Sequence, residues 1–242
     1  MKRRGNIWLM LELFVLGLAV LASCSGDGGS TGDDDDDTSG DDDTSTNNIL
    51  VISDPTVEAW GYAQWLDENY RDDLNTSEFV VELDWRWDSG SGMGVQLMHY
   101  YEIYAEVMVD MFDWGEGPQL EVMVGPGEWQ VCFAPLERGR WYRLKLIVDP
   151  ASKRYSVYLD DQQTACVDFP FLYGNEPLGS FAFMTYMDAS GGTSCFDNVR
   201  ITNAAGEVFR EDFEDDVAGS VPSQPWQMYL EGISVEVVAE QE

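Results

Sequence analysis

Residues 79–88 read FVVELDWRWD, and every second side chain in this stretch is apolar. The apolar side chains belong to Phe79, Val81, Leu83, Trp85 and Trp87, and all but one of the positions between them are charged. Successive side chains of a β-strand point to opposite faces, so this alternation predicts a strand with one buried and one solvated face.

The same alternation recurs along the chain after Ile49. It is clear in residues 101–112, where Glu106 and Asp110 are expected on the solvated face, and in residues 141–149. A turn with Pro150 in its second position then leads into a returning strand at 155–159. Further strands are predicted at residues 120–124, 129–134, 179–187, 195–202, 208–213 and 233–238. Many short strands without a capped helical period predict an all-β fold, a two-sheet antiparallel jelly-roll sandwich.

The first residues have the features of an export signal. A basic start, Lys2 to Arg4, precedes an apolar run at residues 7–21 that only Glu12 interrupts. The run ends in Leu21-Ala22-Ser23-Cys24, which resembles the bacterial lipobox. This resemblance implies that residues 1–23 are a lipoprotein signal peptide and that the mature chain begins at a lipidated Cys24. The alternative is an ordinary secretory signal followed by a chance cysteine.

Residues 24–48 are expected to form a disordered, lipid-anchored linker. They consist almost wholly of Gly, Ser, Thr and Asp, including the runs 33–37 and 41–43. Such a segment cannot bury apolar area, and its like charges repel. The aspartates lack the order of an EF-hand loop, so a plain spacer is favoured over a calcium site. Resemblance to lipoproteins with Ser at the second mature position implies the outer membrane, with display at the surface, ahead of a β-sandwich domain at 49–242.

The charge and the single histidine exclude several functions. The chain carries 45 acidic residues against 13 Lys and Arg, a net charge of −32, which argues against nucleic acid as a partner. His99 is the one histidine, so a site that needs two imidazoles is excluded. We expect His99 to lie between strands in a structural role. Cys132, Cys166 and Cys195 allow one disulfide, and all three pairings remain open.

Two further motifs carry a resemblance to a known fold family. Residues 140–149 with 155–161 resemble the central hairpin of concanavalin A-like lectin/glucanase jelly rolls, including laminin-G-like domains. Residues 195–201, CFDNVRI, resemble the closing "DNV" strand of bacterial domains of this class. These motifs are short, and they support the fold more than any function.

The resemblance raises the question of glycoside hydrolysis. Glucanases of this fold carry three carboxylates on one strand face, and Glu82 and Asp84 match the first two. The places of the third hold Arg86 and Trp87. A retaining mechanism needs two carboxyl groups about 5–5.5 Å apart. Six strand residues separate Glu82 from Asp88, which corresponds to roughly 20 Å. A solvated sheet face is therefore favoured, and a glycoside hydrolase-like enzyme is the alternative.

Aromatic side chains beside carboxylates suggest carbohydrate binding. Trp114 lies in a Gly-rich loop, and Tyr104 stands between Glu102 and Glu106. Aromatic faces stack on sugar rings and carboxylates accept hydroxyl hydrogen bonds, so Trp114, Tyr104 and Glu102 are the candidate sugar contacts. Most Trp residues in a sandwich are core residues, which we expect of Trp85, Trp129 and Trp141. The leading hypothesis is a non-catalytic binding or adhesion lipoprotein that recognises carbohydrate, and a structural envelope lipoprotein without a small ligand is a further alternative.

The C-terminal part resembles the opening of related bacterial sandwich domains. In those domains a "DFE…G…P…W" stretch comes first, whereas here residues 209–226 follow the "DNV" strand, which suggests a circular permutation. A turn at residues 203–206 is predicted to form a hairpin that brings Asp197 opposite residues 211–214. The resemblance implies a structural Ca²⁺ with Asp197, Asp212 and Glu214 among its ligands, and the alternative is an ordinary acidic surface.

Overall fold

The computed structural model describes residues 47–54, 60–66, 74–75, 77–90, 93–99, 105–113, 117–173, 177–185, 192–223 and 225–240. Cys24 and most of the predicted linker lie outside these ranges, as do Glu102, Tyr104 and Trp114. Within the described ranges, no helix is both long and apolar enough to cross a membrane.

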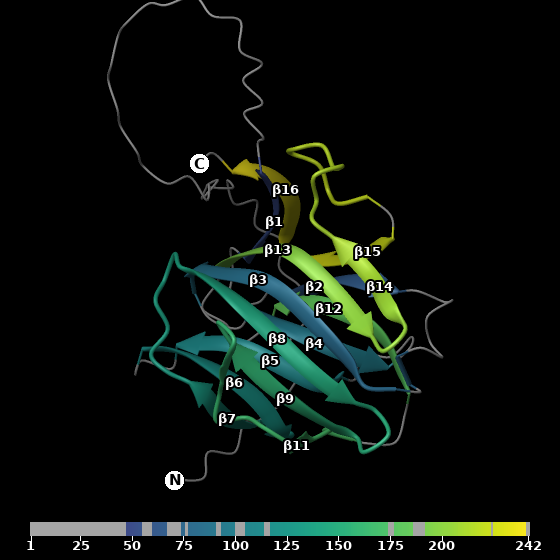
Figure 1. Cartoon of the computed structure of the whole chain (residues 1–242). Helices are drawn as coiled ribbons and strands as arrows, with labels where there is room; N and C mark the ends of the chain where they lie inside the picture. The colour runs from purple at the N-terminus through teal and green to yellow at the C-terminus, as the bar shows by residue number, and fades with distance from the viewer. Residues whose placement is uncertain are drawn as a thin grey trace, which may run out of the picture.

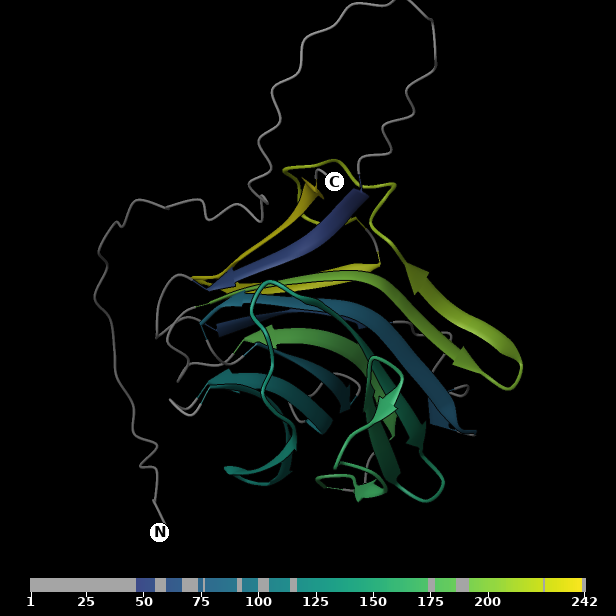
Figure 2. The same ribbon diagram turned by 60° about the vertical axis from the view of Figure 1, so that its left-hand side comes forward.

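Two antiparallel sheets pack face to face, and Figure 2 shows the two layers from the side. The nine-stranded sheet has the order β10 (Gln162–Gln163), β9 (Arg154–Leu159), β8 (Trp141–Asp149), β3 (Phe79–Ser89), β13 (Gly192–Asn203), β1 (Asn47–Asp54) and β16 (Ser234–Glu240). In addition, β11 (Phe169–Pro170) pairs with β9, and β14 (Gly206–Glu211) pairs with β13. The seven-stranded sheet has the order β15 (Trp226–Glu231), β2 (Trp60–Leu66), β12 (Leu178–Thr185), β4 (Met93–His99), β5 (Ala105–Asp113), β6 (Pro118–Gly125) and β7 (Glu128–Phe133). The predicted all-β jelly-roll sandwich is confirmed.

The core lies between the sheets and is rich in aromatic rings. The alternating side chains of Phe79, Val81, Leu83, Trp85 and Trp87 all face it, as predicted, and Trp85 is fully buried there. The Phe183 ring from β12 stacks on Phe196 of β13, with 4.1 Å between ring centroids. These contacts join the two layers, and they leave the polar side chains of β3 and β8 on the outer face of the nine-stranded sheet.

The predicted hairpin after the "DNV" strand is confirmed. β13 and β14 pair antiparallel, from Asn203 opposite Gly206 to Val199 opposite Glu211. The first and last strands, β1 and β16, also pair along their length and lie side by side at one end of the molecule (Figure 1, Figure 2). The two ends of the described domain are therefore close together, as a circular permutation would require.

Some strands are not evident from alternation. β1, β2 and β4 are not predicted by the sequence pattern, nor are β15 and the two short strands β10 and β11. β1 also includes Asn47 and Asn48, so the domain begins two residues before its predicted start at 49. His99 is the last residue of β4, so the prediction that it lies between strands is wrong. The prediction of a solvated face for Glu106 and Asp110 is also wrong, because both side chains are fully buried. The segment after β11 covers the outer face of the seven-stranded sheet at Glu106, where the backbone N–H groups of Leu172 and Tyr173 donate to the carbonyl and carboxylate oxygens of Glu106.

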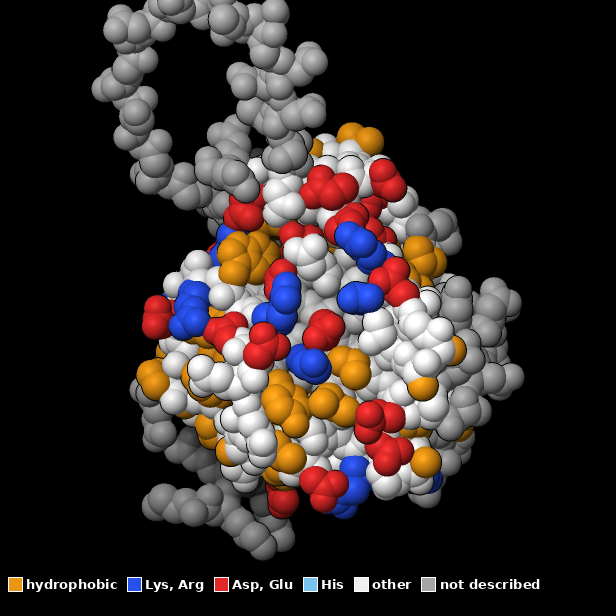
Figure 3. Space-filling model, viewed as in Figure 1, with side chains coloured by type: hydrophobic (Ala, Val, Ile, Leu, Met, Phe, Trp, Pro, Cys, Tyr) orange, Lys and Arg blue, Asp and Glu red, His pale blue; other side chains and the backbone are white. Residues whose placement is uncertain are grey.

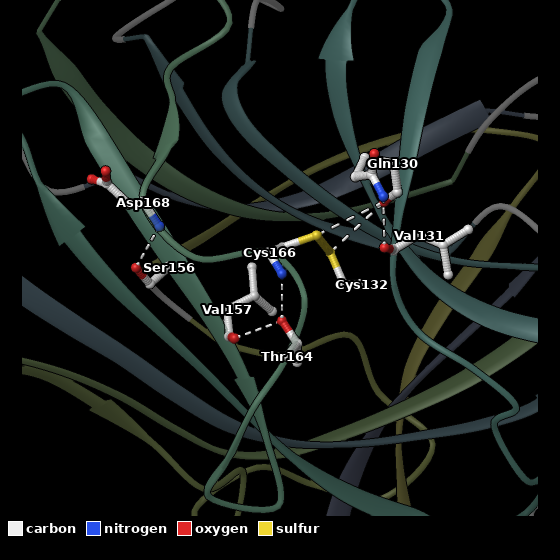
Figure 4. The surroundings of a disulfide bond; sticks show 8 residues. All are labelled: Gln130, Val131, Cys132, Ser156, Val157, Thr164, Cys166 and Asp168. Carbon is white, nitrogen blue, oxygen red and sulfur yellow. Dashed lines mark hydrogen bonds between the residues drawn. A yellow bond between two sulfur atoms is a disulfide. The ribbon is translucent and has the colours of Figure 1, made fainter.

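One disulfide joins Cys132 at the end of β7 to Cys166 in the segment after β10, with Cα atoms 5.0 Å apart. Figure 4 shows the bond beside Thr164, whose hydroxyl donates to the carbonyl oxygen of Val157 at 2.8 Å. The disulfide therefore connects the edge strand of one sheet to the chain that follows the edge of the other. Cys195 remains a buried thiol, and the guanidinium of Arg86 lies 3.3 Å from its Sγ.

Candidate functional site

The outer face of the nine-stranded sheet carries closely mixed acidic and basic side chains (Figure 3). They come from alternate positions of β3 and β8, because the intervening positions face the core. Lys145 pairs with Glu82 at 3.3 Å, and Arg143 pairs with Asp84 at 3.3 Å. Pairs across neighbouring strands hold these side chains in defined positions.

A β-bulge on β13 adds two more polar groups to this face. The register between β13 and β3 shifts between Asp197 and Arg200, and Asn198 has a positive φ of 51°. The extra residue lets Asp197 and Asn198 both face outward, although they are adjacent in sequence. Phe196 before the bulge and Val199 after it both face the core.

Asn198 joins two carboxylates into one network. Its side-chain amide donates to Asp84 Oδ2 at 2.9 Å and to Asp197 Oδ2 at 3.2 Å. Asn47 of β1 donates a further hydrogen bond to Asp197 Oδ2 at 3.2 Å, and the backbone N–H of Asn198 donates to Asp197 Oδ1 at 2.7 Å. Asp84 and Asp197, directly opposite each other on β3 and β13, are thus bridged by one amide.

The two carboxylates differ in their electrostatic surroundings. The pKa of Asp197 is raised to about 6, chiefly by burial and also by the nearby charges of Asp84 and Glu214, against the lowering effect of its hydrogen bonds. Arg143 faces Asp84, and the hydrogen bond from this guanidinium to Asp84 raises the pKa of Arg143. The arrangement therefore places a carboxyl group that favours protonation beside a carboxylate with a cationic partner.

Trp141 stands at one end of this network. The prediction that it belongs to the core between the sheets is wrong, because Trp141 lies half-buried on the outer face. There it packs on a small apolar cluster of Ile49, Val51 and Cys195. The Arg86 guanidinium lies over its ring, 4.7 Å from the centroid. The ring is thus held in place by a cation on one side and an apolar cluster beneath it.

Two hollows lie over these residues. The first, of about 390 Å³, is lined by Asn47, Asp84, Trp141, Tyr142, Arg143, Asp160, Asp197, Asn198 and Glu240. The second, of about 380 Å³, is lined by Glu82, Leu83, Arg143, Asn198, Val199, Arg200, Glu207 and Arg210. Arg143 and Asn198 line both, so the hollows adjoin, and we call them together the β8–β13 groove.

The turn after β9 closes one side of the groove. Asp160 has a positive φ of 50°, and its carboxylate accepts hydrogen bonds from the Arg143 backbone N–H at 3.0 Å and from the Arg140 guanidinium at 2.5 Å. Each oxygen of this carboxylate accepts one hydrogen bond, so Arg143 of β8 and Arg140 just before it fix the position of the turn at the side of the groove.

The predicted site residues fall in different places. Glu102, Tyr104 and Trp114 lie outside the described residues. Asp197 lies in the groove, and Glu214 is close enough for its charge to act on Asp197. Asp212 instead accepts a hydrogen bond from Arg210 at 3.1 Å.

The predicted calcium ligands do not form a metal centre by themselves. Among the described residues, no three His, Cys, Asp or Glu side chains gather closely enough to hold a metal ion. Asp197 accepts hydrogen bonds from Asn47 and Asn198, and Glu214 accepts one from the Asn48 backbone at 3.0 Å. Amide groups therefore satisfy oxygens that a calcium ion would need.

Sequence reasoning missed Trp141, Arg143 and Asn198 as site residues. A signal for the bulge is present in residues 195–201. The apolar residue has an even number at Phe196, but the apolar residues that follow, Val199 and Ile201, have odd numbers. Such a change of parity within one strand indicates an inserted residue. The pairing of β13 with β3, which brings Asp197 opposite Asp84, is a long-range contact that no local pattern shows.

No family model and no curated protein matches the chain. Among solved structures, it is similar to a sialidase, with a TM-score of 0.49 and 12% identity over 65% of this chain and 15% of the sialidase. It is also similar to a heptameric SAP-like pentraxin from Limulus polyphemus, with a TM-score of 0.45 and 10% identity over 78% of this chain and 95% of the pentraxin. A carbohydrate binding module from Bacillus subtilis gives a TM-score of 0.38 and 19% identity over 58% of this chain and 81% of the module. The chain spans only a small part of the sialidase, and likenesses at these values say nothing about function.

Proposed function

We propose that the protein is a non-catalytic binding or adhesion lipoprotein, displayed at the surface of the outer membrane, that recognises carbohydrate through the β8–β13 groove. The observation that supports it is the first hollow, in which the Trp141 ring stands beside a fixed network of carboxylate, amide and guanidinium groups. An aromatic surface next to side chains that donate and accept hydrogen bonds suits a sugar ring, which is apolar on its faces and carries hydroxyl groups at its edge.

The shape of the groove favours a chain of sugars over a single one. Each hollow falls within the size range of small-ligand sites, roughly 300–1,000 Å³. The two adjoin at Arg143 and Asn198, so consecutive sugar units would reach both. The rigid sheet beneath the groove keeps the ordering cost of binding small.

A glycan array followed by calorimetric titration of the best ligand tests this proposal. We expect Trp141→Ala to weaken binding at least about tenfold, which corresponds to about 1.4 kcal/mol. Arg143→Gln, at an exposed position, should weaken it without disturbing the core. Tyr158→Ala is the matched control, because Tyr158 is an aromatic residue of the same outer face that lines neither hollow. Equal losses in Trp141→Ala and Tyr158→Ala, or no glycan bound at all, would count against the groove.

Glycoside hydrolysis is a second candidate, and one observation favours it. The sequence lacks the third carboxylate on β3, but the fold brings Asp197 from β13 opposite Asp84, with the pKa of Asp197 raised to about 6. A carboxyl group with a raised pKa that stands opposite a second carboxyl group is the pattern expected of a general acid. A reducing-sugar assay separates the candidates: turnover that Asp197→Asn abolishes while binding persists would replace the non-catalytic proposal.

A structural calcium ion with Asp197, Asp212 and Glu214 among its ligands remains a prediction. It requires the amide groups of Asn47 and Asn198 to move aside, because they now donate to Asp197. If the ion binds only the folded protein, calcium must raise the melting temperature, and Asp197→Asn must reduce that rise.

A further inference from the structure

The outer face of the seven-stranded sheet contains buried polar side chains that the proposed groove does not use. They are Gln64, Gln96, Glu106, Asp110, Glu121 and Ser180. On β5 the residues Val107, Val109 and Met111 face the core, so Glu106 and Asp110 face the other way. β4, β5 and β6 lie side by side in the layer behind the nine-stranded sheet in Figure 1.

Asp110 is the exceptional member of this group. Its side chain is fully buried, and within the described part of the chain neither carboxylate oxygen has a hydrogen-bond partner. The carboxylate extends over Gly94, its neighbour on β4. A Cβ atom at position 94 would lie only 1.6 Å from Asp110 Oδ1, so a glycine is needed here to make room for the carboxylate.

The neighbouring carboxylates differ from Asp110, because each has a partner. Glu121, directly opposite on β6, is 2% exposed and accepts a hydrogen bond from Gln119 at 2.6 Å. Glu106, on the same strand and face, accepts one from the backbone N–H of Tyr173 at 2.7 Å. Asp110 alone combines complete burial with two unsatisfied oxygens and a like charge opposite.

This arrangement is unfavourable unless something neutralises it. Burial raises the pKa of Asp110 well above its ordinary value, and the charge of Glu121 raises it further. A buried, unpaired carboxylate costs several kcal/mol. The positions that face Asp110 from β4, Gly94 and Gln96, carry no charge, and the residue opposite on β6 is acidic. None of these described neighbours offers Asp110 a positive charge, and a cation or a proton would neutralise it.

We propose that Asp110 and Glu121 hold a hard divalent cation on the outer face of β5 and β6. Two carboxylates with several oxygens suit Ca²⁺ or Mg²⁺, whose remaining positions would be filled by carbonyl oxygens or water. This site lies on the other sheet from Asp197 and Glu214, and it does not depend on glycan binding.

Melting curves of the full-length chain test the site, with chelator-treated protein titrated with CaCl₂ or MgCl₂ at pH 5 and pH 8. We expect the wild-type melting temperature to rise with each tenfold increase in cation, and more at pH 8, because the ligands must be deprotonated. Asp110→Asn should abolish this rise and should melt no lower than wild type in chelator, because it removes a buried charge. Gly94→Ala should displace the carboxylate and also abolish the rise.

Controls exclude general screening of a chain with net charge −32. Glu106→Gln removes the same charge from a partnered carboxylate on the same strand and should keep the response. This variant and Asp110→Asn are both compared in an Asp197→Asn background, so that an ion at Asp197 does not contribute. NaCl at equal ionic strength should not reproduce the response. The proposal is overturned if neither cation shifts the wild type beyond the NaCl control, or if Asp110→Asn responds like the wild type. It is also overturned if the stability of the wild type falls with rising pH equally in chelator and in excess cation, and does not fall in Asp110→Asn, since a proton is then the occupant.

Discussion

Asn198 shows how one residue can create a site. Its left-handed backbone conformation is one that asparagine adopts more readily than other non-glycine residues. This conformation allows the bulge, and the bulge places Asn198 on the outer face next to Asp197. In a regular strand, Asn198 would face the core and could not bridge Asp84 to Asp197.

The same residue scale gives a prediction on pH. The pKa of Asp197 is raised from 3.8 to about 6, so the folded state holds this proton more tightly than the unfolded state does. The stabilisation from the proton is complete below about pH 3.8 and is lost as the pH rises through about 6. We therefore expect the free energy of unfolding to fall over this window, and Asp197→Asn to reduce that fall, as measured by urea denaturation at closely spaced pH values.

A suitable control for this measurement is Asp161→Asn, at an exposed carboxylate of the turn after β9. Both variants remove one negative charge, so the general repulsion in an acidic protein changes equally. If the two variants show the same dependence on pH, Asp197 has no special contribution.

At the level of elements, prediction worked where one face of a strand is solvated. β8 coincides with its predicted range, and β3 extends only one residue beyond it. β2 and β4 were missed because polar and apolar residues are buried together on them, as with Gln64 and Gln96, so hydrophobicity does not alternate cleanly. The groove was missed for a different reason, because it depends on the pairing of β13 with β3 and β1, whose residues are far apart in sequence.

The disulfide gives a prediction at the same level. Cys132 and Cys166 close a loop with a sequence separation of 34. By the loop-entropy relation, such a cross-link stabilises the folded state by about 3–4 kcal/mol. We expect the double variant Cys132→Ser/Cys166→Ser to lose about this much in chemical denaturation. Reductant should destabilise the wild type and leave the double variant unchanged; a reductant effect that persists in the double variant would show that it does not come from this disulfide.

At the scale of the whole molecule, the predicted linker and the domain both carry a net negative charge. The linker carries nine aspartates and no Lys or Arg, whereas the domain has 35 acidic and ten basic residues, so both parts are negative and repel each other. At physiological salt the Debye length is about 8 Å, so this repulsion reaches only the nearest part of the domain.

It follows that a fragment of residues 47–242 should fold by itself, because β1 begins at Asn47 and pairs with both β13 and β16. Its circular dichroism should be β-rich, and its melting temperature should match that of the longer chain at physiological salt. A fragment that begins at residue 55 is the contrasting control: it lacks β1, which carries the buried Leu50 and Ile52, and should not fold. A stable 55–242 fragment would contradict this reading of β1.

The membrane attachment of the molecule is predicted to depend on Cys24 alone. The apolar run at residues 7–21 is too short to be a typical membrane span, which needs about 20 residues, and it is expected to be removed with the signal peptide. Two or more acyl chains anchor a protein stably, whereas the acidic linker and domain would be repelled by anionic lipids.

Cys24→Ala should therefore move the protein from the membrane fraction to an unprocessed or soluble form and abolish palmitate labelling. Ser23→Thr, which keeps the cysteine, is a milder control that should retain labelling. Protease added to intact cells should digest the wild-type domain if it faces outward. Unchanged membrane fractionation of Cys24→Ala, with an unchanged N-terminus, would show that another segment holds the protein at the membrane.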